Sequence, residues 1–356
     1  MSEALKRTVL YEEHCKLAAK LVDFAGWEMP IQYQGISKEH MAVREACGIF
    51  DVSHMAEFIV VGEDVAAFLD YTCLNRASKL KVGRAQYSMV SNYQGGLVDD
   101  IFVYRLAETS YLIIVNASNH HKVWEHFHKL QEGYRVGFED VSEQYALIAV
   151  QGPSSTEVLS QTLGSDIAIK RNAFIDCDYR GQTLKIARTG YTGEAVGYEV
   201  LIPNDVAASF WAQLLQAGAL ACGLGARDSL RLEAGFPLYG HEFHDDSNPL
   251  CSDYAWVVKD KDFYGREAMW TGNCQQRLVA LELRGKGIAR EGYEVYAQDQ
   301  HIGSISSGIM SPLSKKAIAF AWIDSAHAEL GKGIEVQIRN KRVAAEIVKA
   351  PFLSKQ

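Results

Sequence analysis

The sequence predicts an α+β fold that ends in a small β-barrel. Strands and helices alternate up to about residue 275, a pattern typical of mixed sheet domains. Beyond that point only short strands follow at regular spacing, which indicates a barrel. The 356 residues are 48% hydrophobic and 22% charged, an ordinary globular composition that excludes collagen-like and disordered chains.

Apolar periodicity predicts the elements in the first part of the chain. Leucines at helical spacing predict a helix over residues 9–23, and a second short helix over 38–47 stops before Gly48. The next segment mixes β-rich runs with helical stretches. Its expected strands are 57–61, 101–104 and 111–115, and its expected helices are 64–71 and 119–131.

The chain then returns to a sheet before its character changes. Strands are expected over 145–150, 184–188 and 198–202. Asp205 is expected to be the N-cap of a helix that stops near Gly218, and another helix follows Gly225. The expected barrel strands are 278–283, 318–322, 335–339 and 343–348, the last two joined as a hairpin through Asn340-Lys341.

Charge and cysteine usage narrow the classes of function. Lys and Arg total 36 against 44 Asp and Glu, and the net charge of −8 lacks the basic field that nucleic-acid binding needs. No apolar run approaches the roughly 20 residues of a membrane span. No apolar segment follows the charged residues among positions 1–7, whereas a secretory signal requires one. We therefore expect no secretory signal and a cytoplasmic location. The seven cysteines are widely spaced without a C-x-x-C pair, which predicts free thiols and no metal site.

A glycine pair precedes Asp99 and Asp100, which enter a predicted strand. Because side chains alternate in a strand, Asp100, Phe102 and Tyr104 share one face, and Asp99 lies on the apolar face. Asp100 would then face a cavity beside two aromatic rings, where desolvation perturbs the pKa of a carboxyl group. The alternative is that both acids cap a turn at the strand end.

The segment from Arg188 to Glu194 places two glycines around Tyr191, a pattern that lets the backbone approach a ligand closely. Glu199 opens an apolar strand soon afterwards, where an unpaired acid is costly. A flat heterocycle with adjacent N–H donors would satisfy that carboxylate. The alternative is a surface loop followed by an acid on an edge strand.

Two further residues are candidates for chemistry. Arg227 stands at a helix start, where it could clamp a carboxylate; the alternative is an arginine paired within the fold. The glycines before it do not complete a dinucleotide-binding loop, because position 228 is Asp. His54 could carry a proton, although a lone histidine among core residues is more often structural.

Taken together, these segments resemble the glycine cleavage T-protein family of aminomethyltransferases over about residues 6–353. The resemblance rests on the order and spacing of Phe24 to Pro30, Phe50 to Met55, Gly95-Gly96 with Asp99-Asp100, Gln151 to Pro153, Arg188 to Glu194, Gly225 to Asp228, Leu232 to Gly235 and Ser306 to Pro312. It implies three domains arranged as a cloverleaf around a central folate site. These are a discontinuous N-terminal folate-binding domain of residues 1–54 and 142–274, an inserted α+β domain of 55–141, and a C-terminal β-barrel domain of 275–356.

The resemblance also implies site residues. Asp100 matches the family's essential catalytic acid beside the folate. The matching folate-contacting positions are Met55, Tyr87, Tyr104, Asn116, Tyr191, Glu199 and Arg227. Relatives usually have one residue between the acid at Glu194 and the next glycine, whereas this chain has two, Ala195 and Val196. Unless the loop absorbs the extra residue, the strand register reverses and Glu199 faces away.

The implied reaction moves an aminomethyl carbon from the lipoyl sulfur of a partner, the H-protein, to tetrahydrofolate as co-substrate. Ammonia and dihydrolipoyl H-protein leave, and 5,10-methylenetetrahydrofolate forms. Two other classes share the fold: a folate-dependent demethylase of small methylated compounds, and a non-enzymatic folate-binding factor for iron–sulfur cluster maintenance. The factor carries a cysteine motif, and Arg266 stands here in place of that cysteine.

Overall fold

The computed structural model describes residues 4–353, and the chain divides into two compact units. The first unit comprises residues 4–69, 76–88 and 101–228, and the second comprises 70–75, 89–100 and 229–353. The three domain boundaries expected from the resemblance stay predictions. The prediction that concerned residues 1–3 lies outside the described part of the chain. Within residues 4–353, no helix has the length and apolarity to cross a membrane.

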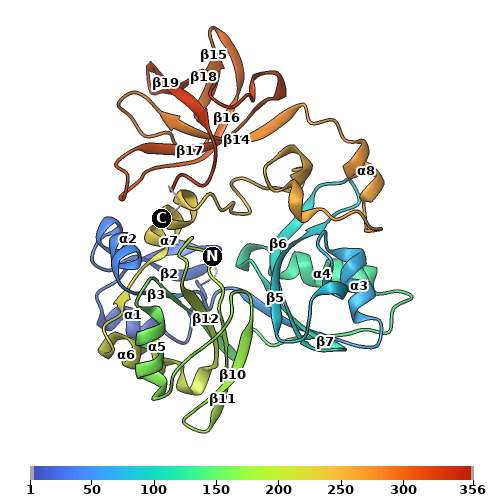
Figure 1. The fold of residues 1–356 in the computed structure, drawn as a ribbon, viewed down its shortest axis with the longest axis vertical. Helices are drawn as coiled ribbons and strands as arrows, with labels where there is room; N and C mark the ends of the chain where they lie inside the picture. Colours follow the sequence, from blue (N-terminus) through green and yellow to red (C-terminus); the bar gives the residue numbers. More distant parts are fainter. Residues whose placement is uncertain (1–3, 354–356) are drawn as a thin grey trace. The chain divides into compact units, whose positions relative to one another are not determined.

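The first unit contains a six-stranded sheet with the order β10-β11-β12-β9-β3-β13 (Figure 1). Its strands are β3 (Gly48–Asp51), β9 (Tyr145–Gln151), β10 (Phe174–Tyr179), β11 (Gln182–Ala187), β12 (Gly197–Pro203) and β13 (Leu220–Ala221). Helices α5 (Ser155–Leu163) and α6 (Asn204–Gln216) pack against it. Phe210, Trp211 and Leu214 of α6 have no exposed surface. Burying side chains of this size stabilises the fold by about 1.5–3 kcal/mol each.

A second sheet has the order β5-β6-β7-β4-β8. Its strands are β4 (Ala56–Val61), β5 (Arg84–Ser91), β6 (Leu97–Ala107), β7 (Ser110–Val115) and β8 (Gly137–Asp140). Helices α3 (Val65–Thr72) and α4 (His120–Leu130) cover one face, where the ring of Phe68 lies 5.6 Å from that of Phe127 and 5.4 Å from that of Phe138. The strands β5 and β6 each run from one unit into the other, so the chain path links the units here.

Shorter elements occur in both units. They are α1 (Tyr11–Lys16), β1 (Lys20–Phe24), β2 (Trp27–Gln32), α2 (Ile36–Glu45), α7 (Leu224–Glu233), α8 (Arg266–Thr271) and 3-10 turns at Ala77–Lys79, Ala117–Asn119, Pro249–Cys251, Ala255–Val257 and Ser325–His327. The helix expected over 9–23 is wrong beyond Lys16, because Ala18 adopts φ +51° and the chain turns into β1. Asp205 is not an N-cap: α6 begins at Asn204, so its charge lies in the first turn, where the helix dipole still favours it.

The second unit ends in a closed six-stranded β-barrel (Figure 1, orange to red). The strands β14 (Gln276–Leu283), β15 (Glu294–Ala297), β16 (Gln300–Met310), β17 (Ala317–Asp324), β18 (Gly333–Ile338) and β19 (Lys341–Val348) follow the order β14-β17-β16-β15-β18-β19, and β14 pairs back with β19. Closure leaves no unpaired sheet edge. Leu281, Ala319 and Val336 are fully buried among its side chains. The barrel expected after residue 275 is confirmed.

One cysteine pair differs from the expectation of free thiols. Cys251 and Cys274 form a disulfide in the second unit, with their Cα atoms 5.3 Å apart. The free thiols in the described chain are Cys15, Cys47, Cys73, Cys177 and Cys222. The expectation is therefore wrong for two residues, because a separation of 23 residues carries no motif and only the fold brings them together.

Candidate functional site

Three polar side chains meet in the first unit, one from each of three segments. The Tyr104 hydroxyl on β6 donates to Glu199 Oε2 on β12 at 3.4 Å and lies 3.3 Å from Thr189 Oγ1. Thr189 Oγ1 donates to the same carboxylate oxygen at 2.6 Å. Burial raises the pKa of Tyr104 well above its usual range, and the charge of Glu199 raises it further. The phenol therefore keeps its proton and acts as a hydrogen-bond donor.

The extra residue before Glu199 does not turn this acid away from Tyr104. β12 begins at Gly197, and Glu199 pairs with Ala149 of β9 and with Ala187 of β11. Just before the strand, Val196 O accepts a hydrogen bond from the backbone nitrogen of Gly152 at 3.1 Å. The loop thus holds the additional residue outside the strand ladder, and the strand register is kept.

The loop that carries Thr189 is fixed by one buried amide, that of Gln151. Gln151 Nε2 donates to Thr189 O at 3.2 Å and to Tyr198 O at 2.9 Å, and its Oε1 accepts from Thr192 Oγ1 at 2.8 Å. A Cβ atom on Gly190 would lie 2.1 Å from Gln151 Oε1. This glycine therefore makes room for the amide. The prediction that the loop approaches a ligand closely stays a prediction.

Arg227 interacts electrostatically with Glu199, and His54 interacts with Arg227. The Arg227 guanidinium carbon lies 4.9 Å from the ring centroid of Tyr191, and its buried Nη1 has no hydrogen-bond partner among the described residues. Burial lowers the pKa of Arg227, and the charge of Glu199 partly offsets this effect. Burial also lowers the pKa of His54 to about 4, with a contribution from Arg227. Buried donors without a partner are rare in folded proteins, so Nη1 of Arg227 is a candidate ligand-binding group.

The structure places the other predicted residues individually. Met55, directly before β4, is half-buried, as are Tyr87 on β5 and Asn116 directly after β7. Asp100 belongs to the second unit and is half-buried, and neighbouring Asp99 is fully buried, as strand alternation predicts. In the second unit, the charge of Asp100 contributes, after burial and Glu242, to raising the pKa of Tyr254.

Sequence reasoning missed three residues around these groups. Thr189 and Gln151 appeared only inside motifs, and their contacts depend on which loops meet. Glu57, on β4, has no exposed surface, and neither side-chain oxygen has a hydrogen-bond partner among the described residues. The signal for Glu57 was present, because it opens an apolar strand as Glu199 does and the same desolvation argument applies to it.

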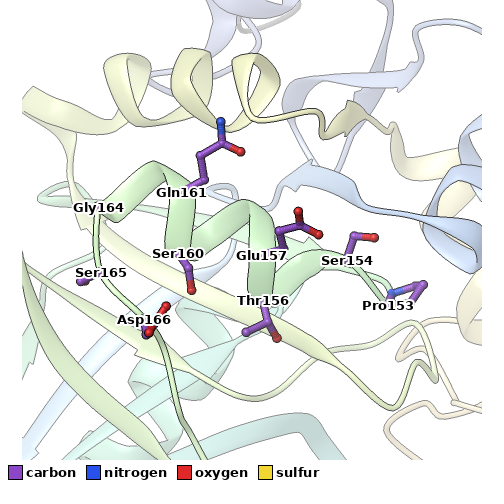
Figure 2. Close-up of a pocket in the computed structure, with 9 residues that line it drawn as sticks. All are labelled: Pro153, Ser154, Thr156, Glu157, Ser160, Gln161, Gly164, Ser165 and Asp166. Atoms are coloured by element: carbon purple, nitrogen blue, oxygen red, sulfur yellow. The ribbon is translucent and has the colours of Figure 1, made fainter.

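A hollow on the protein surface lies along α5, away from all of these side chains. Figure 2 shows it lined by polar groups that include Ser154, Glu157, Ser160 and Asp166. It is open to solvent and contains none of the predicted site residues. Because the hollow contains none of these residues, we take the Tyr104, Thr189 and Glu199 cluster as the candidate site.

Comparison with known proteins gives full-length similarity. Residues 10–262 match the family model described as the GCVT N-terminal domain, and residues 276–353 match the glycine cleavage T-protein C-terminal barrel domain. An aminomethyltransferase of Thermus thermophilus is 49% identical over 352 residues, which cover 98% of this chain and 99% of the relative. That of Bacillus subtilis is 42% identical, with 98% and 99% covered. The crystal structure of glycine cleavage system aminomethyltransferase T from Bartonella henselae superposes with a TM-score of 0.92, at 31% identity and 98% coverage of both chains.

Proposed function

Because the chain belongs to the glycine cleavage T-protein family, we propose that it transfers the aminomethyl carbon of S-aminomethyldihydrolipoyl H-protein to tetrahydrofolate. It is an enzyme of the aminomethyltransferase type. The products are 5,10-methylenetetrahydrofolate, ammonia and dihydrolipoyl H-protein. The observation that carries this proposal is the match to aminomethyltransferases along the whole chain, barrel included.

The side chains of the first unit fit a folate heterocycle. Glu199 offers an acceptor, and the buried Nη1 of Arg227 is a donor without a hydrogen-bond partner among the described residues. The ring of Tyr191, against Arg227, offers a flat apolar surface. A heterocycle with N–H donors and ring acceptors would use all three. By the resemblance, the proposal includes further folate contacts at Met55, Tyr87, Tyr104 and Asn116.

The chain's own residues contribute binding and electrostatics rather than a covalent nucleophile. Tetrahydrofolate, when bound, supplies the nitrogen atoms that accept the carbon. Holding both substrates in place can lower the barrier by on the order of 7–11 kcal/mol at best. In the proposed mechanism, the carboxylate of Asp100 either stabilises positive charge that develops at the transferred carbon or moves a proton during ring closure.

The decisive assay measures ammonia release from aminomethylated H-protein, with and without tetrahydrofolate. We expect release to depend on folate and to yield methylenetetrahydrofolate. Asp100→Asn keeps the shape and removes the charge, and should lower kcat by about a hundred-fold or more. Full turnover in that variant would contradict the electrostatic role. Folate binding without folate-dependent release would instead favour the demethylase or a binding role.

Two structural and cellular expectations belong to the same proposal. The domain boundaries at residues 54/55, 141/142 and 274/275 are proposed from the resemblance, and limited proteolysis with mass spectrometry of the fragments tests them. The cytoplasmic location is proposed from the sequence, and cell fractionation tests it.

A further inference from the structure

Glu57 is a buried acid whose side chain makes no hydrogen bond within the described chain. It has no exposed surface, and both Oε1 and Oε2 lack a partner among the described residues. Burial raises its pKa well above the usual range for glutamate, and the charge of Asp140 adds to the effect. A raised pKa favours the protonated form of this carboxyl group. In the protonated form it has one O–H donor and spare acceptor capacity.

The other fully buried acids of the first unit differ in this respect. Among the described residues these are Glu39 and Asp51. Glu39 Oε1 accepts from three successive backbone nitrogens, at residues 33–35, and Asp51 accepts from Thr8, His14 and the backbone of Ser53. A buried polar group without a partner costs about 1–3 kcal/mol. An apolar side chain would avoid that cost at position 57, so packing does not account for the acid.

Strand register places Glu57 on the same sheet face as Tyr104. Glu57 on β4 pairs with Ile114 on β7, and Ile114 pairs with Phe102 on β6. Directly paired residues share a face, so these three side chains form a row, and Tyr104 follows Phe102 on that face. Phe58, the next residue along β4, points to the opposite face and contacts Trp124 of α4 with ring centroids 5.0 Å apart.

Glu57 in its ionised form would act electrostatically on the same phenol as Glu199. Burial is the largest influence on the pKa of Tyr104, followed by the charge of Glu199 and two hydrogen bonds. The charge of Glu57 is a smaller contribution that also raises this pKa. The two acids come from different sheets, β4 and β12. Glu199 accepts a hydrogen bond from the phenol, whereas Glu57 is linked to it by charge alone. Glu199 already accepts hydrogen bonds from Thr189 and Tyr104, whereas Glu57 accepts and donates none within the described residues.

We propose that Glu57 is a second ligand-binding acid of this site and donates a hydrogen bond to a carbonyl or ring-nitrogen acceptor of the bound tetrahydrofolate heterocycle. This assignment rests on the proposed function. A heterocycle of this class presents N–H donors beside acceptors on one edge. Glu199 suits the donors because it is an acceptor, and Glu57 suits the acceptors because its O–H has no partner in the described chain.

The proposal predicts opposite effects on stability and on affinity for one variant. Glu57→Met keeps the side-chain length and removes the buried polar atoms, so it should raise the Tm of the ligand-free protein. The same variant should bind tetrahydrofolate about ten-fold or more weakly, because a ring acceptor then loses its donor. Glu57→Gln retains an N–H donor of similar shape and should bind within about three-fold of the wild-type protein.

Calorimetric titration with tetrahydrofolate under anaerobic conditions measures Kd, and differential scanning fluorimetry of the full chain measures Tm. Val60→Ala is the matched control, because Val60 is fully buried on the opposite face of β4. It should lower Tm and leave Kd unchanged. Wild-type affinity in Glu57→Met, or equal losses in Glu57→Met and Glu57→Gln, would overturn the assignment and leave the proposed function intact. A wild-type protein that does not bind tetrahydrofolate would overturn both.

Discussion

Breaking the buried ion pair between Arg231 and Glu242 should destabilise the second unit strongly. Arg231 Nη1 donates to Glu242 Oε2 at 2.6 Å, and the two side chains are 1% and 0% exposed. Glu242 also accepts from the hydroxyls of Ser306 and Ser307 and from the backbone nitrogen of Leu238. Burial alone would raise the pKa of Glu242, but the Arg231 charge and these hydrogen bonds outweigh burial and lower it overall.

Glu242→Gln removes the charge and keeps the size. It leaves the Arg231 guanidinium buried without a counter-charge, and the loss of one partner from a buried pair costs about 3–5 kcal/mol. At roughly 2–4 °C per kcal/mol for a unit of this size, Tm should fall by about 10 °C in scanning calorimetry of the full chain at neutral pH.

The effect of pH on this pair has a definite sign. The pKa of Glu242 is lower in the folded protein than the roughly 4.3 of an unfolded chain, so its stabilisation is complete above that pH. Stability is lost as pH falls from there through the folded pKa. The difference in Tm between the wild-type protein and Glu242→Gln should therefore become smaller as pH falls through this acidic range.

An exposed pair in the same unit provides the matched control. Arg284 Nη2 lies 2.9 Å from Glu346 Oε2, with side chains 44% and 39% exposed. Solvent screening limits such a pair to about 1 kcal/mol or less, so Glu346→Gln should hardly change Tm. Equal Tm shifts in Glu242→Gln and Glu346→Gln would refute the argument from burial.

Three further changes test other parts of the structure. Gly190→Ala places a Cβ 2.1 Å from Gln151 Oε1, so the amide must move and stability should fall by about 1–3 kcal/mol; an unchanged Tm would show that the loop adapts freely. Cys274→Ser opens the 23-residue link to Cys251 and should cost about 3 kcal/mol by loop entropy. Dithiothreitol should lower the wild-type Tm to the value of that variant and leave the variant unchanged; a dithiothreitol-insensitive wild-type Tm would contradict this. Burial lowers the pKa of His54 to about 4, from roughly 6.5 in the unfolded chain, so the unfolded state binds more protons and stability falls as pH drops between these values. Denaturation measured across that range should show a weaker dependence of stability on pH in His54→Asn than in the wild-type protein. The same pH dependence in both proteins would count against a buried neutral imidazole.

Local patterns in the sequence predicted many of the elements, because they depend on neighbouring residues. The strands β9 and β14 and the helix α6 carry apolar periodicity that matches their observed bounds closely. The prediction failed over residues 9–23, where leucine spacing continues past Lys16 but the backbone reverses at Ala18. A single left-handed residue leaves no signature in hydrophobic spacing.

The sequence alone determined the family resemblance, the barrel and the residue types suited to a heterocycle, since these follow from local motifs and their order. Only the tertiary structure decided that Glu199 meets Tyr104 despite the inserted residue, because the loop before β12 absorbs it. The structure also decided that Gly190 serves the Gln151 amide and that Glu57 is a buried acid whose side chain lacks a partner among the described residues. Burial and hydrogen bonding depend on segments distant in sequence, so the pKa and the role of a carboxyl group are fixed only when those segments pack together.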